Sequence, residues 1–148
     1  MPSTASPAER ALPDTAAPAP RPDRAIVTVC TACRPEGVSR HEAPGRVFHD
    51  LVRQELAGLA ACTVRPSECL SVCKRPCTVA VSHPEGYTFL FGDLQGQEAA
   101  LGLAAFARRY VEAPYGFVPW RDRPEVLRGA IVARVPPAGW SPEDGGTP

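Results

Sequence analysis

Residues 77–92 read CTVAVSHPEGYTFLFG and carry the clearest secondary-structure signal of the chain. Two runs rich in β-branched and aromatic residues flank the turn sequence PEG. Such runs joined by a Pro-Gly turn are typical of an antiparallel β-hairpin. The sequence therefore predicts two neighbouring antiparallel strands here.

The segments on either side of this hairpin alternate between strand and helix signals. AIVTVC at 25–30 is the kind of short apolar run that forms a central strand. Residues 45–59, GRVFHDLVRQELAGL, have apolar side chains at helical spacing and predict an amphipathic helix that ends near Gly58. A second helix is predicted over 95–111, and a short one over 122–129.

A cysteine-rich connection precedes the hairpin. CTVR at 62–65 predicts a second short strand that is broken by Pro66. We expect Ser67 to cap a single helical turn over Cys69 to Cys73, which would place these two thiols on one side.

The order strand, helix, strand, hairpin, helix predicts an α/β fold with a mixed sheet in the thioredoxin-like arrangement. A chain of 148 residues fits one domain. We expect it to span 25–135, between a disordered Ala/Pro-rich tail at 1–24 and a flexible tail at 136–148.

Composition excludes several functional classes. Sixteen basic residues balance sixteen acidic ones, so no overall field attracts nucleic acid or anionic lipid. The chain has neither an apolar run long enough for a membrane span nor the features of a secretory signal. We expect a soluble, cytoplasmic protein, and the sequence gives no indication of its oligomeric state. Clustered cysteines in the cytosol indicate metal or catalysis more often than disulfides.

All six cysteines lie between residues 30 and 77. Cys30 and Cys33 form a C-x2-C motif at the end of the first predicted strand, and Cys69 and Cys73 lie before the hairpin. In the predicted fold both groups meet at one edge of the sheet. The sequence therefore predicts a four-thiolate site, which suits either zinc or an iron-sulfur cluster.

The other cysteines leave alternatives open. Cys77 is either a fifth ligand, able to replace Cys33, or a small buried apolar residue. Cys62 is expected to be a buried non-ligand. The C-x2-C motif also allows a thiol-disulfide oxidoreductase. Against this, the helix begins only near Gly45, so we expect its dipole to be poorly placed to lower a thiol pKa.

Basic residues adjoin both cysteine groups. Arg34 follows the first group, and Lys74 and Arg75 follow Cys73. Such basic residues would raise the potential of a cluster or attract an acidic redox partner, but the overall neutrality of the chain favours simple solvation.

Three sequences, CTACR, ECLSVCKRPCTVAV and PWRDRPEVLRGAIVARVPP, resemble a bacterial family of unknown function described as predicted metal-binding proteins. That family is similar to the thioredoxin-like 2Fe-2S ferredoxins, and the resemblance covers residues 25–137. It implies a thioredoxin-like fold with a cluster at one edge, with Cys30 matching the first ligand and Cys69 and Cys73 matching the C-x3-C loop. Those ferredoxins place their second ligand farther from the first than Cys33 is here.

We therefore expect a ferredoxin-like protein that holds a 2Fe-2S cluster through Cys30, Cys33, Cys69 and Cys73. It would transfer electrons to a partner protein or sense redox state, and would not be an enzyme. The first alternative is a zinc or other metal site for structure or metal delivery. The family's occurrence beside cobalt and cobalamin genes suggests that context. The second alternative is a thiol-disulfide oxidoreductase.

Overall fold

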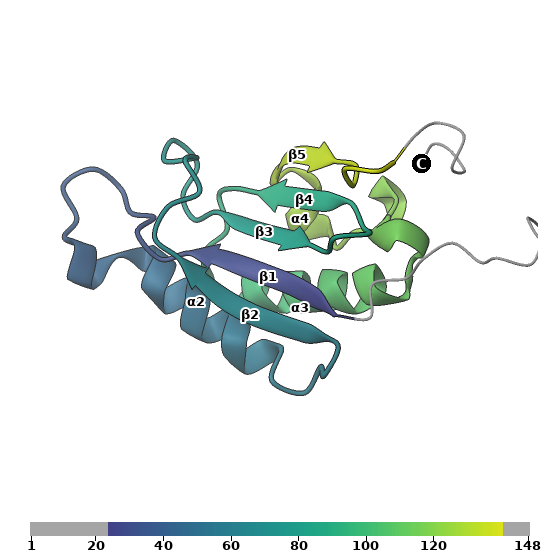
Figure 1. Ribbon diagram of the computed structural model, residues 1–148. Helices are drawn as coiled ribbons and strands as arrows, with labels where there is room; N and C mark the ends of the chain where they lie inside the picture. Colours follow the sequence, from purple (N-terminus) through teal and green to yellow (C-terminus); the bar gives the residue numbers. More distant parts are fainter. Residues whose placement is uncertain (1–23, 141–148) are drawn as a thin grey trace, which may run out of the picture.

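The computed structural model describes residues 24–140 (Figure 1). The tails predicted to be disordered therefore lie outside the described residues, except for residue 24 and residues 136–140. None of the described helices has the length and hydropathy of a membrane span. The strands are β1 (Ala25–Cys30), β2 (Cys62–Ser67), β3 (Val79–Ser82), β4 (Thr88–Phe91) and β5 (Ile131–Val135), and the α-helices are α2 (Pro44–Glu55), α3 (Gly96–Glu112) and α4 (Glu125–Arg128).

The five strands form one sheet in the order β2-β1-β3-β4-β5. The parallel pair β1 and β2 is joined by the crossover helix α2, whereas the β1–β3, β3–β4 and β4–β5 pairs are antiparallel. Helices α2 and α3 lie side by side against the sheet (Figure 1). This is the thioredoxin-like arrangement in a single domain, so the predicted fold class is confirmed.

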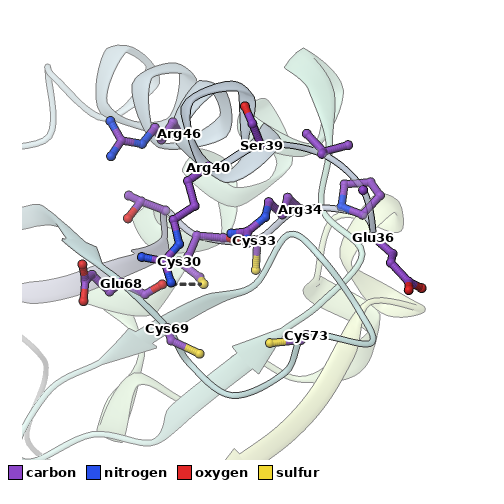
Figure 2. Close-up of a pocket in the computed structure, with 15 residues that line it drawn as sticks. Cys30, Cys33, Arg34, Glu36, Ser39, Arg40, Arg46, Glu68, Cys69 and Cys73 are labelled. Atoms are coloured by element: carbon purple, nitrogen blue, oxygen red, sulfur yellow. Dashed lines mark hydrogen bonds between the residues drawn. The ribbon is translucent and has the colours of Figure 1, made fainter.

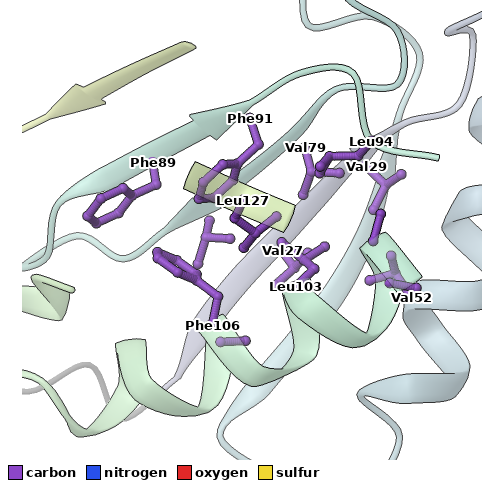
Figure 3. Packing of buried hydrophobic residues seen from close by; sticks show 14 of the residues in the cluster. Val27, Val29, Val52, Val79, Phe89, Phe91, Leu94, Leu103, Phe106 and Leu127 are labelled. Carbon is purple, nitrogen blue, oxygen red and sulfur yellow. The ribbon is translucent and has the colours of Figure 1, made fainter. Parts of the chain in front are cut away.

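The core lies between the sheet and these helices. Alternate residues of each central strand are buried, as their period-two pattern requires. Aromatic rings fill the space above β4: Phe89 and Phe91 each meet the Phe106 ring of α3 edge-on, at centroid distances of 5.0 and 5.1 Å (Figure 3). The hairpin and α3 are therefore fixed by the same cluster of side chains.

Two strands differ from the prediction. Pro66 does not break β2, which continues to Ser67 in parallel register with β1. A proline is tolerated there because β2 is an edge strand, whose outer side needs no N–H donor. At the other edge, β5 adds a fifth strand that the predicted order did not contain.

The helical turn predicted over Cys69 to Cys73 is wrong. Residues 68–78 form an irregular loop between β2 and β3, which we call the second cysteine loop. Ser67 remains in strand pairing with Cys30, and its hydroxyl donates to the Cys69 carbonyl (3.4 Å) instead of capping a helix. Ser71 has a φ of 61°, which is outside the right-handed helical region.

Candidate metal centre

The first cysteine pair lies where β1 ends. Cys30 is the last residue of β1, and its N–H donates to the Thr78 carbonyl (3.0 Å). Its Sγ donates to the carbonyl of Glu68 in the second cysteine loop (3.6 Å). The Cys33 Sγ donates to the Thr78 hydroxyl (3.7 Å). Both thiols are buried. Because their hydrogen-bond partners belong to the second cysteine loop, contacts with that loop hold the first pair in place.

Burial raises the pKa of Cys33 to about 11, and a hydrogen bond with Cys30 adds to this rise. Hydrogen bonds with the side chain and the backbone of Thr78 act in the opposite direction on the same pKa. Cys33 is therefore a protonated thiol at neutral pH. At neutral pH a bound metal would have to displace this proton.

Helix α2 begins against this pair, although ten residues separate it from Cys33 in the chain. The Gly45 N–H donates to the Cys33 carbonyl (3.0 Å), and a Cβ at Gly45 would collide with the Cys30 carbonyl oxygen. The pKa of Cys33 is nevertheless raised, so the expectation that the helix dipole does not lower this thiol pKa is not contradicted. The intervening residues loop out and return (Figure 1). The N–H of Gly45 nevertheless serves the carbonyl of Cys33 and not its sulfur.

The second pair, Cys69 and Cys73, is exposed. The Ser71 N–H donates to the Cys69 Sγ (3.2 Å), and this bond lowers the pKa of Cys69. The negative charge of Cys69 is the main cause of a raised pKa at Cys73, which the guanidinium of Arg34 opposes. The charges of the two thiols thus interact. The charge of Arg34 also acts on Cys73 from the loop between β1 and α2, residues 31–43, which we call the first cysteine loop.

Both pairs line one pocket of about 810 Å³ (Figure 2). The view shows the four sulfur atoms around a common hollow, with Cys30 and Cys33 on one side and Cys69 and Cys73 on the other. Within residues 24–140, however, no three His, Cys, Asp or Glu side chains are close enough to hold one metal ion. The predicted four cysteines therefore meet as two facing pairs.

The remaining two cysteines do not line the pocket. Cys77 is fully buried in the core; burial raises its pKa to about 12, and the charges of the nearby Cys33 and Cys30 add to this rise. Cys62 is half-buried at the start of β2, also away from the pocket. The burial of Cys77 agrees with a place in the apolar core, and its role as a ligand stays a prediction.

Three arginines line the same pocket: Arg34, Arg40 and Arg46. Neither Arg40 nor Arg46 forms an ion pair with any residue in the described part of the chain. Glu36 and Glu68 also line the pocket and offset part of the positive charge. Lys74 does not line it, and Arg75 points its guanidinium to Asp93, at 2.7 Å. Of the basic residues that the sequence predicted beside the site, only Arg34 lines the pocket.

A profile of a family described as proteins of unknown function, DUF1636, matches residues 27–137. The chain belongs to this family. The match runs from the third residue of β1 to beyond β5 and includes both cysteine pairs, and it confirms the resemblance to a family of unknown function seen in the sequence.

Among solved structures, the DUF1636 chain is similar to a thioredoxin-like [2Fe-2S] ferredoxin from Aquifex aeolicus. The two are 14% identical, the alignment covers 80% of this chain and 99% of the ferredoxin, and the TM-score is 0.49. A likeness at this level carries no argument about the site. Among curated proteins, no sequence matches this DUF1636 chain.

Sequence reasoning missed several residues of the DUF1636 site. Thr78 and Ser71 each contact a cysteine sulfur, and Arg40 and Arg46 line the pocket. No local pattern identifies them, since each is recognised only by contacts between segments distant in the chain. The glycine at 45 carries the one available signal, because a glycine in the first turn of a helix often permits a close backbone approach.

Proposed function

We propose that this protein holds a 2Fe-2S cluster between its two cysteine pairs and carries or senses single electrons. The observation that supports this most is the arrangement of four thiols as two facing pairs around one pocket. Thiolate-bound 2Fe-2S centres take four cysteines, two for each of two irons. One tetrahedral zinc instead needs all four sulfurs within about 4 Å of one another, given a Zn–S bond of about 2.3 Å.

Each pair then has a distinct role. Cys30 and Cys33 form the buried half of the site, shielded from water by the β1 end and α2. Cys69 and Cys73 form the exposed half, where the Ser71 N–H stabilises a thiolate. A cluster supplies the ability to take up and release one electron, and the exposed pair gives that electron a short path to a partner.

Metal and sulfide analysis of anaerobically purified protein tests this function. We expect iron and acid-labile sulfide in equal amounts, with visible absorption. Cys30→Ser and Cys69→Ser, one from each pair, should both lose the cluster, whereas Cys62→Ser should keep it because Cys62 lies outside the pocket. Zinc in stoichiometric amount without sulfide would replace this proposal with the zinc alternative.

One observation favours a second function, thiol-disulfide exchange at the exposed pair. Cys69 is exposed, its pKa is lowered by the Ser71 N–H, and Cys73 lies beside it as a resolving thiol. This function requires metal-free protein that reduces a disulfide, with activity lost in Cys69→Ser. A cluster-containing protein without that activity excludes it.

Cys77→Ser separates a core role from a ligand role. Because Cys77 is fully buried, the new hydroxyl should lower the free energy of unfolding by about 1–3 kcal/mol. Iron and sulfide content per folded chain should stay at the wild-type level. Urea unfolding and metal analysis of the same preparation measure both, with Cys77→Ala as a variant that adds no polar group. Loss of iron in both variants would make Cys77 a ligand.

The arginines of the pocket are expected to select acidic partners, since focused positive charge speeds the approach of anions. Ferricyanide and hexaammineruthenium(III) are small oxidants of opposite charge that can replace the partner. Arg40→Gln combined with Arg46→Gln should slow oxidation by ferricyanide by roughly two- to tenfold at low salt, and should not slow the cationic oxidant. Arg53→Gln, on the last turn of α2, is the control. Equal rates with ferricyanide in all proteins would show that the arginines do not steer anions.

A further inference from the structure

Thr78, the last residue of the second cysteine loop, contacts both Cys30 and Cys33. It is fully buried immediately before β3, and its carbonyl accepts the N–H of Cys30 (3.0 Å). Its backbone is therefore fixed to the end of β1, and its side chain meets Cys33 from the first loop and two carbonyls of the second cysteine loop.

The Thr78 hydroxyl is the middle of a hydrogen-bond chain. It accepts from the Cys33 Sγ (3.7 Å) and donates to the Arg75 carbonyl (3.2 Å), with the Val72 carbonyl at 3.5 Å. A hydroxyl has one hydrogen and serves one acceptor well at a time. With Cys33 as a thiol, therefore, its sulfur donates to the Thr78 hydroxyl, and that hydroxyl donates to a carbonyl of the second cysteine loop.

Both carbonyls have another donor. The Arg75 N–H donates to the Val72 carbonyl (3.0 Å), and the Asp93 N–H donates to the Arg75 carbonyl (2.9 Å). If the Thr78 hydroxyl turns away, neither carbonyl is left as a buried group without a partner. The rotation therefore avoids the usual cost of breaking a buried hydrogen bond.

A sulfur that binds metal has lost its hydrogen and only accepts. We propose that Thr78 is a positioning residue whose hydroxyl turns from the second cysteine loop to the Cys33 sulfur when that sulfur is a ligand, and so raises the reduction potential of the centre. This inference rests on the proposed function. Hydrogen bonds to ligand sulfurs are among the factors that set cluster potentials, because they stabilise the more negative, reduced form.

Redox titration of three variants of the anaerobically purified full chain tests this role. Thr78→Val keeps the shape and removes the hydroxyl, Thr78→Ser keeps the hydroxyl, and Thr88→Val repeats the change on β4 away from the pocket. We expect Thr78→Val to lower the equilibrium constant for reduction about tenfold, which is 59 mV for a one-electron couple. Thr78→Ser and Thr88→Val should stay near the wild-type value.

Proton ENDOR of the reduced centre in H2O and D2O supplies a second readout. The exchangeable proton contributed by the hydroxyl should be present in the wild type and in Thr78→Ser, and absent from Thr78→Val. Thr78→Ala, which also lacks the hydroxyl, replaces the valine variant if that one fails to fold.

The outcomes separate the two proposals. Wild-type protein without iron and sulfide overturns the proposed function. Wild-type protein that holds a cluster, together with a Thr78→Val variant of unchanged potential and unchanged exchangeable-proton signal, overturns the role of Thr78 alone. An equal fall in potential in Thr78→Val and Thr88→Val would show a general effect of the substitution and also count against it.

Discussion

Gly45→Ala should unfold or strongly destabilise the protein and remove any bound centre, although it adds only one methyl group. The new Cβ would overlap the Cys30 carbonyl oxygen and lie 3.1 Å from the Cys33 backbone nitrogen. These are backbone atoms of the first cysteine pair, so no side-chain rotation relieves the overlap. Overpacking of this kind costs about 1–3 kcal/mol or more, and we expect about 3 kcal/mol here.

Thermal unfolding and metal content measure this effect together. A loss of about 3 kcal/mol should lower the melting temperature by roughly 10 °C. Gly58→Ala is the matched control, because no atom lies within 4 Å of a Cβ at that glycine. It should fold and bind metal as the wild type does. A Gly45→Ala protein with wild-type stability and a complete centre would show that α2 does not begin against the cysteine pair.

Arg75→Ala should loosen the second cysteine loop. The Arg75 Nε pairs with the Asp93 carboxylate at 2.7 Å, and its other nitrogens donate to the carbonyls of Ile131 (3.4 Å) and Gly129 (3.3 Å). These bonds tie the loop to the β4–α3 turn and to the start of β5. Hydrogen bonds with charged groups contribute roughly 1.5–3 kcal/mol each when buried, and partial exposure reduces this, so we expect a loss of about 2 kcal/mol.

Hydrogen exchange of residues 68–77 reports on the loop directly. Its amides should exchange faster in Arg75→Ala, with little change in β1 or α3. Arg128→Ala is a matched control, since Arg128 likewise donates to two backbone carbonyls, those of Arg121 and Arg123, away from the cysteines. It should leave the loop unchanged. Equal exchange rates in wild type and Arg75→Ala would show that the loop is held by other contacts. Arg75→Lys should restore little, because a lysine does not reproduce the fork of donors.

The fold was predictable where local patterns and packing agree. The hairpin at β3 and β4, the strand β1 and the helices α2 and α3 all show the period that their buried faces require. The second cysteine loop was not predictable in detail. Cys69 and Cys73 are four residues apart, as on one side of a helix, but no helix forms. Ser67 is held in the sheet and Ser71 adopts a left-handed conformation, and neither constraint is visible in the local sequence.

In the candidate site, too, local patterns predicted some features, and long-range contacts decide the others. The thiols of the two pairs could be chosen from spacing and from the expected edge of the sheet, and they do line one pocket. That the four thiols form two facing pairs depends on how the two cysteine loops come together in space, which the sequence does not show. The role of Thr78 depends on contacts with residues up to 45 positions away. The return of α2 to the end of β1 is likewise a long-range contact, permitted by a single glycine.

X-ray absorption spectroscopy of the metal in anaerobically purified protein tests the central claim, that the two cysteine pairs share one binuclear centre. We predict iron surrounded by sulfur with a second iron as a near neighbour, and loss of that iron neighbour in both Cys30→Ser and Cys69→Ser. A single metal ion with no metal neighbour, or an unchanged iron spectrum when either pair is broken, would contradict it.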